Sequence, residues 1–406
     1  ADRWSELREY HEILRNRGIA INFATLCGHG NIRASVMGYD NRMPDDKEMS
    51  EMKILLKSAI NNGAKGLSTG LIYPPGIYSN TEELIELCKI LIPFHVYATH
   101  MRSEGEGVIE SINEVIKIGR EGNVRVHISH LKVSGEENWY KTEEVIRLLT
   151  DARDSGVHLT CDSYPYIAAS TDLDSILPSW VYEGGIEEEI KRLKNRFTRD
   201  KIKGHLNLKD KDYWKGVYIS SVKKDKNKWM EGRNIHDIAL EIGKDTVDFV
   251  IDILIDESTQ VEAIFFLMNE DRQKIFWSLP FTMIGSDSAS RSFSGPTCHG
   301  KPHPRGFGSF PRFIGKYVRD EGLISLPEAI RKITFLPANT FGLHKRGLIK
   351  EGFFADITIF DYNKIIDNAT FKDPFTRSEG IEYVFVNGKI AYERGDFTGG
   401  LFGSII

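Results

Sequence analysis

The stretch HVYATHMRSEGEGVIESINEVIKIGREGNVRVHISHLK, residues 95–132, decides the fold. It contains two short apolar runs, HVYATH (95–100) and VRVHISH (124–130), and a helical pattern at 107–120 connects them. Both runs are apolar almost throughout, as strands are when helices cover both faces of a sheet. The order of strand, helix and strand therefore predicts a parallel pair with a crossover helix.

The same alternation extends outward on both sides of this unit. Further strands are predicted at 18–26, 64–69 and 158–164. Helices are predicted at 45–62, 81–92, 142–154 and 326–334, and the strand alternation is expected to resume at 247–254, 262–268 and 281–287. Repeated units of about 30 residues favour a parallel α/β sheet, and 406 residues are enough for one large α/β barrel with an appendage.

Two stretches depart from this rhythm. Residues 170–235 are rich in helix formers and charges, and we interpret them as an insertion in a barrel domain that covers 1–340. From 341 the pattern is that of β-structure, and the Asn-Gly pair in Val386-Asn387-Gly388-Lys389 is typical of a two-residue hairpin turn. Residues 341–406 are therefore predicted to form part of a small β-domain.

Composition excludes several classes of protein. The 53 Lys and Arg against 58 Asp and Glu give a net charge of −5, so a basic footprint for nucleic acid is absent. The Lys-rich stretch 223–228 is interleaved with Asp and Asn and reads as a solvated loop. No apolar run is long enough to cross a membrane. Four widely spaced cysteines do not form a disulfide framework, so a cytoplasmic location is expected.

Three strand ends carry the side chains that point to chemistry. His100 ends HVYATH, His130 ends VRVHISH and Asp287 ends FTMIGSD (281–287). In a parallel α/β barrel the functional residues collect at the carboxyl ends of the strands. Two imidazoles and a carboxylate at that edge could hold a divalent metal such as Zn²⁺. The structural alternative is that each histidine is a hydrogen-bonded strand end.

A second group of polar residues lies just beyond the predicted strands. It consists of Lys132, Tyr164, Ser170 and Arg305, the last in the long Gly- and Pro-rich loop 285–310. Arg and Lys suit a carboxylate, which Arg binds through two parallel hydrogen bonds. Each of these charges alone is most simply a surface residue. Their position beside the strand ends makes an anionic small-molecule substrate plausible.

Weaker motifs also occur. GLSTG (66–70) matches the GxSxG pattern of serine hydrolases, with Ser68 as the nucleophile, but the prolines at 74 and 75 prevent the helix that this motif requires. His29, between two glycines, and Asp162 are further strand-end candidates. A turn beside a pocket is the simpler interpretation of GLSTG.

Taken together, eight segments resemble the D-aminoacylases, which are N-acyl-D-amino-acid deacylases of the amidohydrolase superfamily. The resemblance is colinear and covers nearly the whole chain. The segments are GHGNIRASVMG (28–38), GAKGLSTGLIYPPG (63–76), YATHMRSEG (97–105), ISHLK (128–132), DSYPYIAAST (162–171), GSD (285–287), HPRGFGSFPR (303–312) and GFFADITIFD (352–361).

The resemblance implies a (β/α)8 barrel beside a small β-sandwich, with zinc at the carboxyl ends of the strands. It also implies hydrolysis of the amide of an N-acyl-D-amino acid, with one tight zinc site and a second, weaker metal. His100 and His130 correspond to zinc ligands, and Asp287 to the catalytic acid and base and a ligand of the second metal. Lys132, Tyr164, Ser170 and Arg305 correspond to the clamp on the α-carboxylate of the substrate.

This sequence departs from the family pattern at one place. The His-x-His motif of the first barrel strand and the cysteine ligand within Asn-Cys-Gly do not occur, so the chain is expected to begin after about two barrel strands. Two alternatives stay open: another metal amidohydrolase, acting on cyclic amides or imides, and a truncated relative without activity. The sequence does not indicate the oligomeric state.

Overall fold

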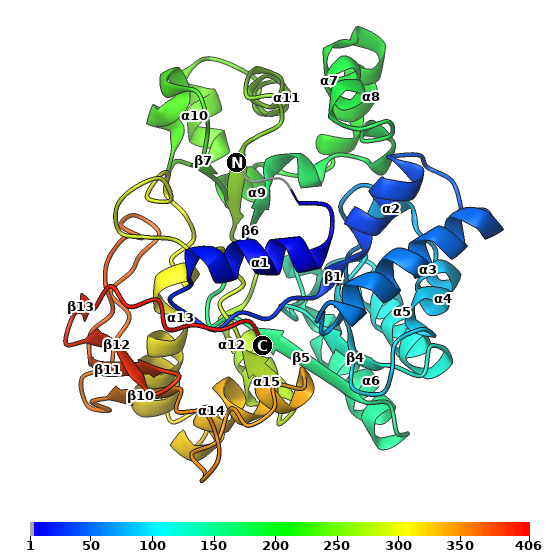
Figure 1. Cartoon of the computed structure of the whole chain (residues 1–406). Helices are drawn as coiled ribbons and strands as arrows, with labels where there is room; N and C mark the ends of the chain where they lie inside the picture. Colours follow the sequence, from blue (N-terminus) through cyan, green and yellow to red (C-terminus); the bar gives the residue numbers. More distant parts are fainter. Residues whose placement is uncertain (1–3) are drawn as a thin grey trace.

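The computed structural model describes residues 4–406, and a single parallel sheet forms its centre (Figure 1). Its six strands lie in the order β1-β2-β3-β4-β5-β9. The first five are adjacent in the order in which they occur in the sequence, and the sixth strand comes from far downstream. The strands are β1 Cys27–Gly28, β2 Gly66–Gly70, β3 Val96–His100, β4 Arg125–Ile128, β5 Leu159–Ser163 and β9 Thr282–Ile284. All their pairings are parallel, which brings the carboxyl ends of the strands to one edge.

Helices connect the successive strands and cover the sheet. They are α2 His29–Met37, α3 Asp46–Asn61, α4 Thr81–Cys88, α5 Val108–Glu121 and α6 Thr142–Asp154. Leu67, Tyr97 and Val126 of the strands share one core with Leu84 and Ile112 of the helices, and all five are at most 1% exposed. Each such burial stabilises the fold by about 1.5–3 kcal/mol. The alternation predicted between residues 45 and 164 is confirmed.

The predicted strand at 18–26 is wrong. After helix α1 (Leu7–Arg17) the chain is extended, but only an isolated bridge between Phe23 and Ile405 is formed. Its backbone groups are paired by the C-terminal residues: Phe23 N donates to Ser404 O over 2.8 Å, and Gly403 N donates to Ile19 O over 2.8 Å. The apolar run therefore pairs with the end of the chain, which passes close to α1 in Figure 1, instead of extending the sheet.

The inserted segment has its own sheet and its own core. Strands β6 (Ala169–Asp172) and β7 (Val217–Ser221) both pair antiparallel with β8 (Glu262–Phe265). The helices of this segment, in the upper part of Figure 1, are α7 Ile186–Lys194, α8 Arg196–Leu206, α9 Lys211–Lys215, α10 Ile235–Glu241 and α11 Thr246–Asp256. The strand predicted at 262–268 therefore exists, but it belongs to this antiparallel sheet and not to the parallel one.

The strand predicted at 247–254 is also wrong, because these residues form α11. Asp245 caps the helix, since its carboxylate accepts hydrogen bonds from the backbone N–H groups of Val247 and Asp248. The buried residues Val247, Val250, Ile251 and Leu254 follow the i, i+3, i+4, i+7 spacing of a helix. A short, continuous apolar run fits a buried strand and a buried helix equally well. Here the capping residue Asp245 favours the helix.

The remaining chain closes the molecule. Helices α12 Glu270–Ser278, α13 Arg305–Arg312, α14 Leu326–Ile333 and α15 Phe335–Thr340 follow the insertion, with a π-helical segment at Phe313–Asp320. A four-stranded antiparallel sheet then consists of β10 Ile357–Phe360, β11 Ile381–Val386, β12 Lys389–Glu393 and β13 Asp396–Phe397. Asn387 and Gly388 have φ angles of 49° and 80°, as a type I′ turn requires, so the predicted hairpin is confirmed.

Two negative findings apply to residues 4–406. No helix there combines the length and the apolar character needed to cross a bilayer. Within the same residues the four cysteines are unpaired thiols, two of them buried.

The core of the insertion gives a direct test of α11. Leu254→Ala removes a fully buried side chain and is expected to lower the free energy of unfolding by about 2–5 kcal/mol. Leu240→Ala, on α10, is the matched control, because this leucine is 71% exposed; its effect is expected to stay within ~0.5 kcal/mol. Urea unfolding followed by tryptophan fluorescence measures both. Equal effects of the two substitutions would contradict the burial of Leu254 on the inner face of α11.

Candidate active site

The carboxyl ends of neighbouring strands meet above one cavity of about 500 Å³. His100 is the last residue of β3 and pairs in register with Gly70 of β2, while His130 follows the end of β4. All the residues that the sequence singled out for a metal or a carboxylate line this cavity. They are His100, His130, Lys132, Tyr164, Ser170, Asp287 and Arg305. The parallel register thus brings together residues that lie up to 205 positions apart in the chain.

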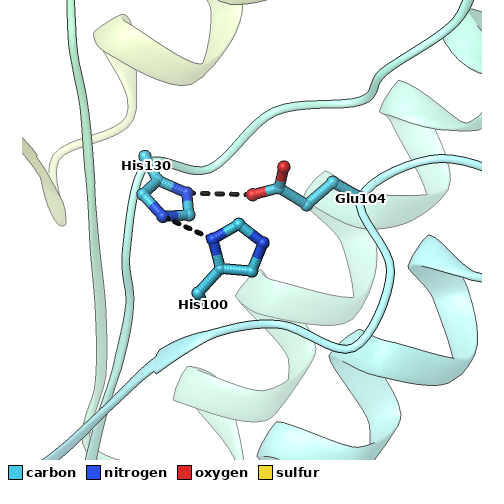
Figure 2. Close-up of side chains that lie close together, drawn as sticks. All are labelled: His100, Glu104 and His130. Atoms are coloured by element: carbon cyan, nitrogen blue, oxygen red, sulfur yellow. Dashed lines mark hydrogen bonds and ion pairs between the residues drawn. The ribbon is translucent and has the colours of Figure 1, made fainter. Parts of the chain in front are cut away.

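The two imidazoles face each other directly. Nδ1 of His100 lies 2.9 Å from Nε2 of His130, and Figure 2 shows both rings with the Glu104 carboxylate beside them. His100 is neutral at physiological pH, because burial lowers its pKa to about 3 and nearby Lys132 acts in the same direction. Its Nε2 atom is buried and has no hydrogen-bond partner among residues 4–406. A neutral imidazole with an unpaired nitrogen is in the form that binds a metal.

Glu104 was not anticipated from the sequence, yet it holds this pair together. Its Oε1 atom lies 2.9 Å from Nδ1 of His130 and 2.5 Å from Nζ of Lys132. Burial would raise the pKa of Glu104, but Lys132, His100 and His130 together hold it well below its usual range. Nδ1 of His130 also lies 2.9 Å from Nζ of Lys132, so Glu104 and Lys132 together fix this side of the ring while Nε2 faces His100. Carboxylate, histidine and zinc form this arrangement in many zinc sites.

The three side chains fit a zinc ion by their chemistry. One ligand atom from each of His100, Glu104 and His130 lies within 4.8 Å of the others. Imidazole nitrogen and carboxylate oxygen are both ligands that zinc accepts. Because Glu104 already contacts His130 and Lys132, it is placed to orient His130, and the two imidazoles offer the nitrogen donors.

Asp162, a weak candidate from the sequence, fixes the backbone of His130. Its Oδ1 atom accepts a hydrogen bond from the His130 N–H over 2.7 Å, and its Oδ2 atom lies 2.8 Å from Nε2 of His127. His130 has a φ of 40°, in the left-handed region that a residue with a side chain rarely adopts. The hydrogen bond that the His130 N–H donates to Asp162 stabilises this strained turn, so Asp162 positions His130 without belonging to the cavity lining.

The predicted carboxylate clamp surrounds an aromatic ring. The Arg305 guanidinium lies 4.5 Å and the Lys132 ammonium 5.9 Å from the ring centre of Tyr164. Burial raises the pKa of Tyr164, so its hydroxyl is protonated and can donate. Nη2 of Arg305 donates to the carbonyl oxygen of Ser170 over 3.3 Å. The four residues therefore place two cationic groups, of Lys132 and Arg305, and two hydroxyl groups, of Tyr164 and Ser170, at the wall of the cavity.

Arg305 and Asp287 form an ion pair at the cavity wall, with 2.9 Å between Nη1 and Oδ2. The pair is close but does not have the geometry of a hydrogen bond, and the buried Nη1 has no hydrogen-bond partner among residues 4–406. Asp287 also has a left-handed φ of 46°. It lies outside the cluster of His100, Glu104 and His130. Strained backbone at two strand ends beside one cavity is typical of functional positions.

Of the remaining sequence candidates, Ser68 lines the cavity without a catalytic partner and His29 is structural. Ser68 lies within β2, and its hydroxyl has no histidine or carboxylate partner in the part of the chain that the structure describes, so GLSTG is a strand and not a nucleophile elbow. His29 begins α2 and is not a strand end. It is fully buried, and its Nε2 atom lies 2.8 Å from Oε1 of Glu83. Oε2 of the same carboxylate accepts a hydrogen bond from Nη1 of Arg33 over 2.5 Å.

The parallel sheet and the histidine pair at its carboxyl edge define an amidohydrolase, and the Amidohydrolase family matches residues 284–392. The D-aminoacylase of Alcaligenes xylosoxydans xylosoxydans is 36% identical over 408 residues, which cover 100% of this chain and 74% of the relative. The chain belongs to this family, the D-aminoacylases and related N-acyl-D-amino-acid deacylases.

Two solved structures agree with this assignment. A D-aminoacylase studied for the role of its binuclear metal centre superimposes with a TM-score of 0.82 at 35% identity, covering 99% of this chain and 75% of the other. The N-acyl-D-glutamate deacylase of Bordetella bronchiseptica, complexed with zinc and a phosphonate mimic of the tetrahedral intermediate, gives 0.82 at 29% identity, with 100% and 76% covered. The fold is thus the amidohydrolase barrel with its small β-domain.

Glu104→Gln tests the positioning of His130. The substitution keeps the size of the side chain but removes the charge that orients Nδ1, so zinc affinity is expected to fall about 10- to 100-fold. Competition with a chelator of known zinc affinity measures the change. Glu106→Gln, two residues away and exposed, is the control and is expected to leave the affinity unchanged. Equal zinc affinities in all three proteins would exclude this role for Glu104.

Proposed function

We propose that this chain carries the site for zinc-dependent hydrolysis of N-acyl-D-amino acids to a carboxylate and a free D-amino acid. One observation carries the proposal: a histidine pair, a carboxylate and a set of carboxylate-binding groups border one cavity of about 500 Å³. The relatives that span the chain are D-aminoacylase and deacylases of N-acyl-D-aspartate and N-acyl-D-glutamate. The substrates given in the names of the two deacylases are linear amides. They favour a linear substrate over a cyclic one.

His100 and His130 would hold the tight zinc ion, and Asp287 would take part in a second, weaker site. When bound, zinc supplies Lewis-acid chemistry that polarises a carbonyl and makes water more acidic. The neutral state of His100 and the 2.9 Å between its Nδ1 atom and Nε2 of His130 support this assignment, because an ion held by the two rings would take the place of their mutual hydrogen bond.

Asp287 would act as the general base and then as the general acid. A carboxylate oxygen takes the proton of the attacking water while the water oxygen bonds to the amide carbon. The same proton then passes to the leaving nitrogen as the C–N bond breaks. Asp287 is 38% exposed on its side chain, so water and substrate can reach it.

Lys132, Tyr164, Ser170 and Arg305 would hold the α-carboxylate of the substrate. The buried Nη1 of Arg305 is the strongest support: it contacts Asp287 only as an ion pair without hydrogen-bond geometry, so its donor capacity is left for a substrate carboxylate. With the carboxylate fixed here, the carbonyl at the histidine pair and the side chain confined to one wall of the cavity, only one enantiomer brings all three groups into place. This constraint would select the D form.

We further propose that the partner of this enzyme is a small N-acyl amino acid substrate, and that it binds neither nucleic acid nor a membrane. The four unpaired cysteines support a cytoplasmic location. We also propose the division of the chain near residue 340 into the barrel part and the small β-domain.

Asp287→Asn tests the catalytic role. It is expected to lower the turnover of N-acetyl-D-methionine about 10²- to 10⁴-fold, because the amide neither accepts nor delivers the proton. The zinc content is expected to change little. Asp271→Asn is the control, since this aspartate on α12 has a 92% exposed side chain. Assays with the L enantiomer and with a cyclic ureide run in parallel. Unchanged turnover in Asp287→Asn, or faster hydrolysis of the ureide, would overturn the proposal.

Arg305→Ala tests the carboxylate clamp. Hydrogen bonds to charged groups contribute about 1.5–3 kcal/mol, so KM is expected to rise roughly 10- to 150-fold. The corresponding N-acyl amine, which has no α-carboxylate, is the matched substrate, and its rate is expected to respond much less. Steady-state kinetics on both compounds measure the difference. A similar loss on both would show that Arg305 supports the fold and not the clamp.

A further inference from the structure

A second cavity, of about 450 Å³, adjoins the first and is acidic. Three carboxylates line it, those of Asp172, Asp174 and Glu189, and no lysine or arginine lines it among residues 4–406. We call it the acidic cavity. It shares Ile72, Tyr73 and Ser175 with the active-site cavity, so the two spaces meet at these side chains.

Glu189 is the least satisfied of the three carboxylates. It is 3% exposed, and its Oε1 atom has no hydrogen-bond partner in the described chain. Burial and the neighbouring Asp174 raise its pKa to about 8, although Arg192 acts in the opposite direction. The Arg192 guanidinium donates instead to the backbone carbonyls of Val181 and Glu183. With this pKa the carboxyl is protonated at neutral pH, and its ionised form would need a counter-charge that no side chain lining the cavity among residues 4–406 provides.

Asp174 is in a similar state. Burial and the charge of Asp172 raise its pKa to about 7. Asp172 itself is exposed and borders both the acidic cavity and a smaller space that contains Asp287 and Arg305. The carboxylates therefore extend from the catalytic residues into the acidic cavity, and a cation entering from the active site would meet all three.

The walls of the acidic cavity show what kind of cation fits. Tyr39, Tyr73 and Tyr182 contribute aromatic rings, and Ile72 and Ile186 contribute apolar surface. The volume is also much larger than a single metal ion needs. Aromatic rings attract organic cations, and apolar walls accommodate an alkyl chain that carries one. These walls favour an ammonium or guanidinium group on an alkyl stem.

The distance to the clamp suits a substrate side chain. Ser170 and Asp172 lie on the same face of β6, because side chains two residues apart in a strand point the same way. They are about 7 Å apart along the strand, roughly the reach of a lysine or arginine side chain. A substrate whose α-carboxylate is held near Ser170 would place a basic group between Asp172 and Asp174.

We propose that the acidic cavity binds the side chain of the substrate, and that this deacylase prefers N-acyl-D-amino acids whose side chain ends in an ammonium or guanidinium group. This inference rests on the proposed function. Tyr73 forms the wall that the two spaces share: its hydroxyl lies 2.6 Å from Oγ1 of Thr171, and its ring centre lies 5.3 Å from that of His100. The side chain of the substrate would pass this ring to reach the three carboxylates.

The test compares two substrates of the same shape, Nα-acetyl-D-lysine and N-acetyl-D-norleucine, on the zinc-loaded chain. The ammonium group is the essential difference, and charge-assisted contacts predict kcat/KM at least about ten-fold higher for the lysine compound. Glu189→Gln is expected to reduce this ratio several-fold. Glu187→Gln, exposed on the same helix α7, is expected to keep the ratio of the unsubstituted protein.

The outcomes separate the two proposals. Hydrolysis of both compounds with a ratio near one, or a preference for norleucine, would overturn the acidic cavity as a side-chain subsite and leave the deacylase intact. Hydrolysis of neither compound would contradict the proposed function. In that case calorimetric titration with D-lysine and D-norleucine still tests the subsite, because equal affinities would overturn it and a clear preference for D-lysine would support it.

Discussion

The contact between Glu104 and Lys132, 2.5 Å long and largely shielded from solvent, is the interaction on which the site depends. It keeps the Glu104 carboxylate ionised, and the ionised carboxylate holds Nδ1 of His130, so that Nε2 faces His100. The same contact balances the buried charge of Lys132 beside the substrate cavity. Without this carboxylate, burial would leave a lysine and two imidazoles close together and uncompensated, which is costly in a protein interior.

The architecture brings groups from three parts of the chain to this contact. The parallel sheet supplies His100 and His130 at its carboxyl edge, the insertion supplies Ser170 on β6, and α13 supplies Arg305. Catalytic candidates thus lie on rigid strand ends, while the insertion contributes the walls that decide which substrate fits.

The sequence predicted the parts of the site that follow from strand ends and from colinear motifs. His100, His130 and Asp287 were placed by the rule that parallel strands end at one edge, and the hairpin at Asn387 by its turn chemistry. Glu104 was missed because it lies in a loop, where no periodicity indicates its direction. Residues 247–254 were assigned to a strand because a short buried apolar run does not distinguish helix from strand. The acidic cavity is lined by residues of β6, α7 and segments far away in the chain, and no local pattern shows that they come together.

The measurement that tests the central claim most directly is the zinc content of the chain compared with that of His130→Ala. Both proteins are dialysed against the same weak chelator, analysed for metal and checked for folding by circular dichroism. The account predicts close to one zinc per chain, and almost none in a folded His130→Ala protein, because this imidazole is one of two direct donors. Equal zinc in both proteins, or none in the folded unsubstituted chain, would contradict the claim that the strand-end histidines bind the metal.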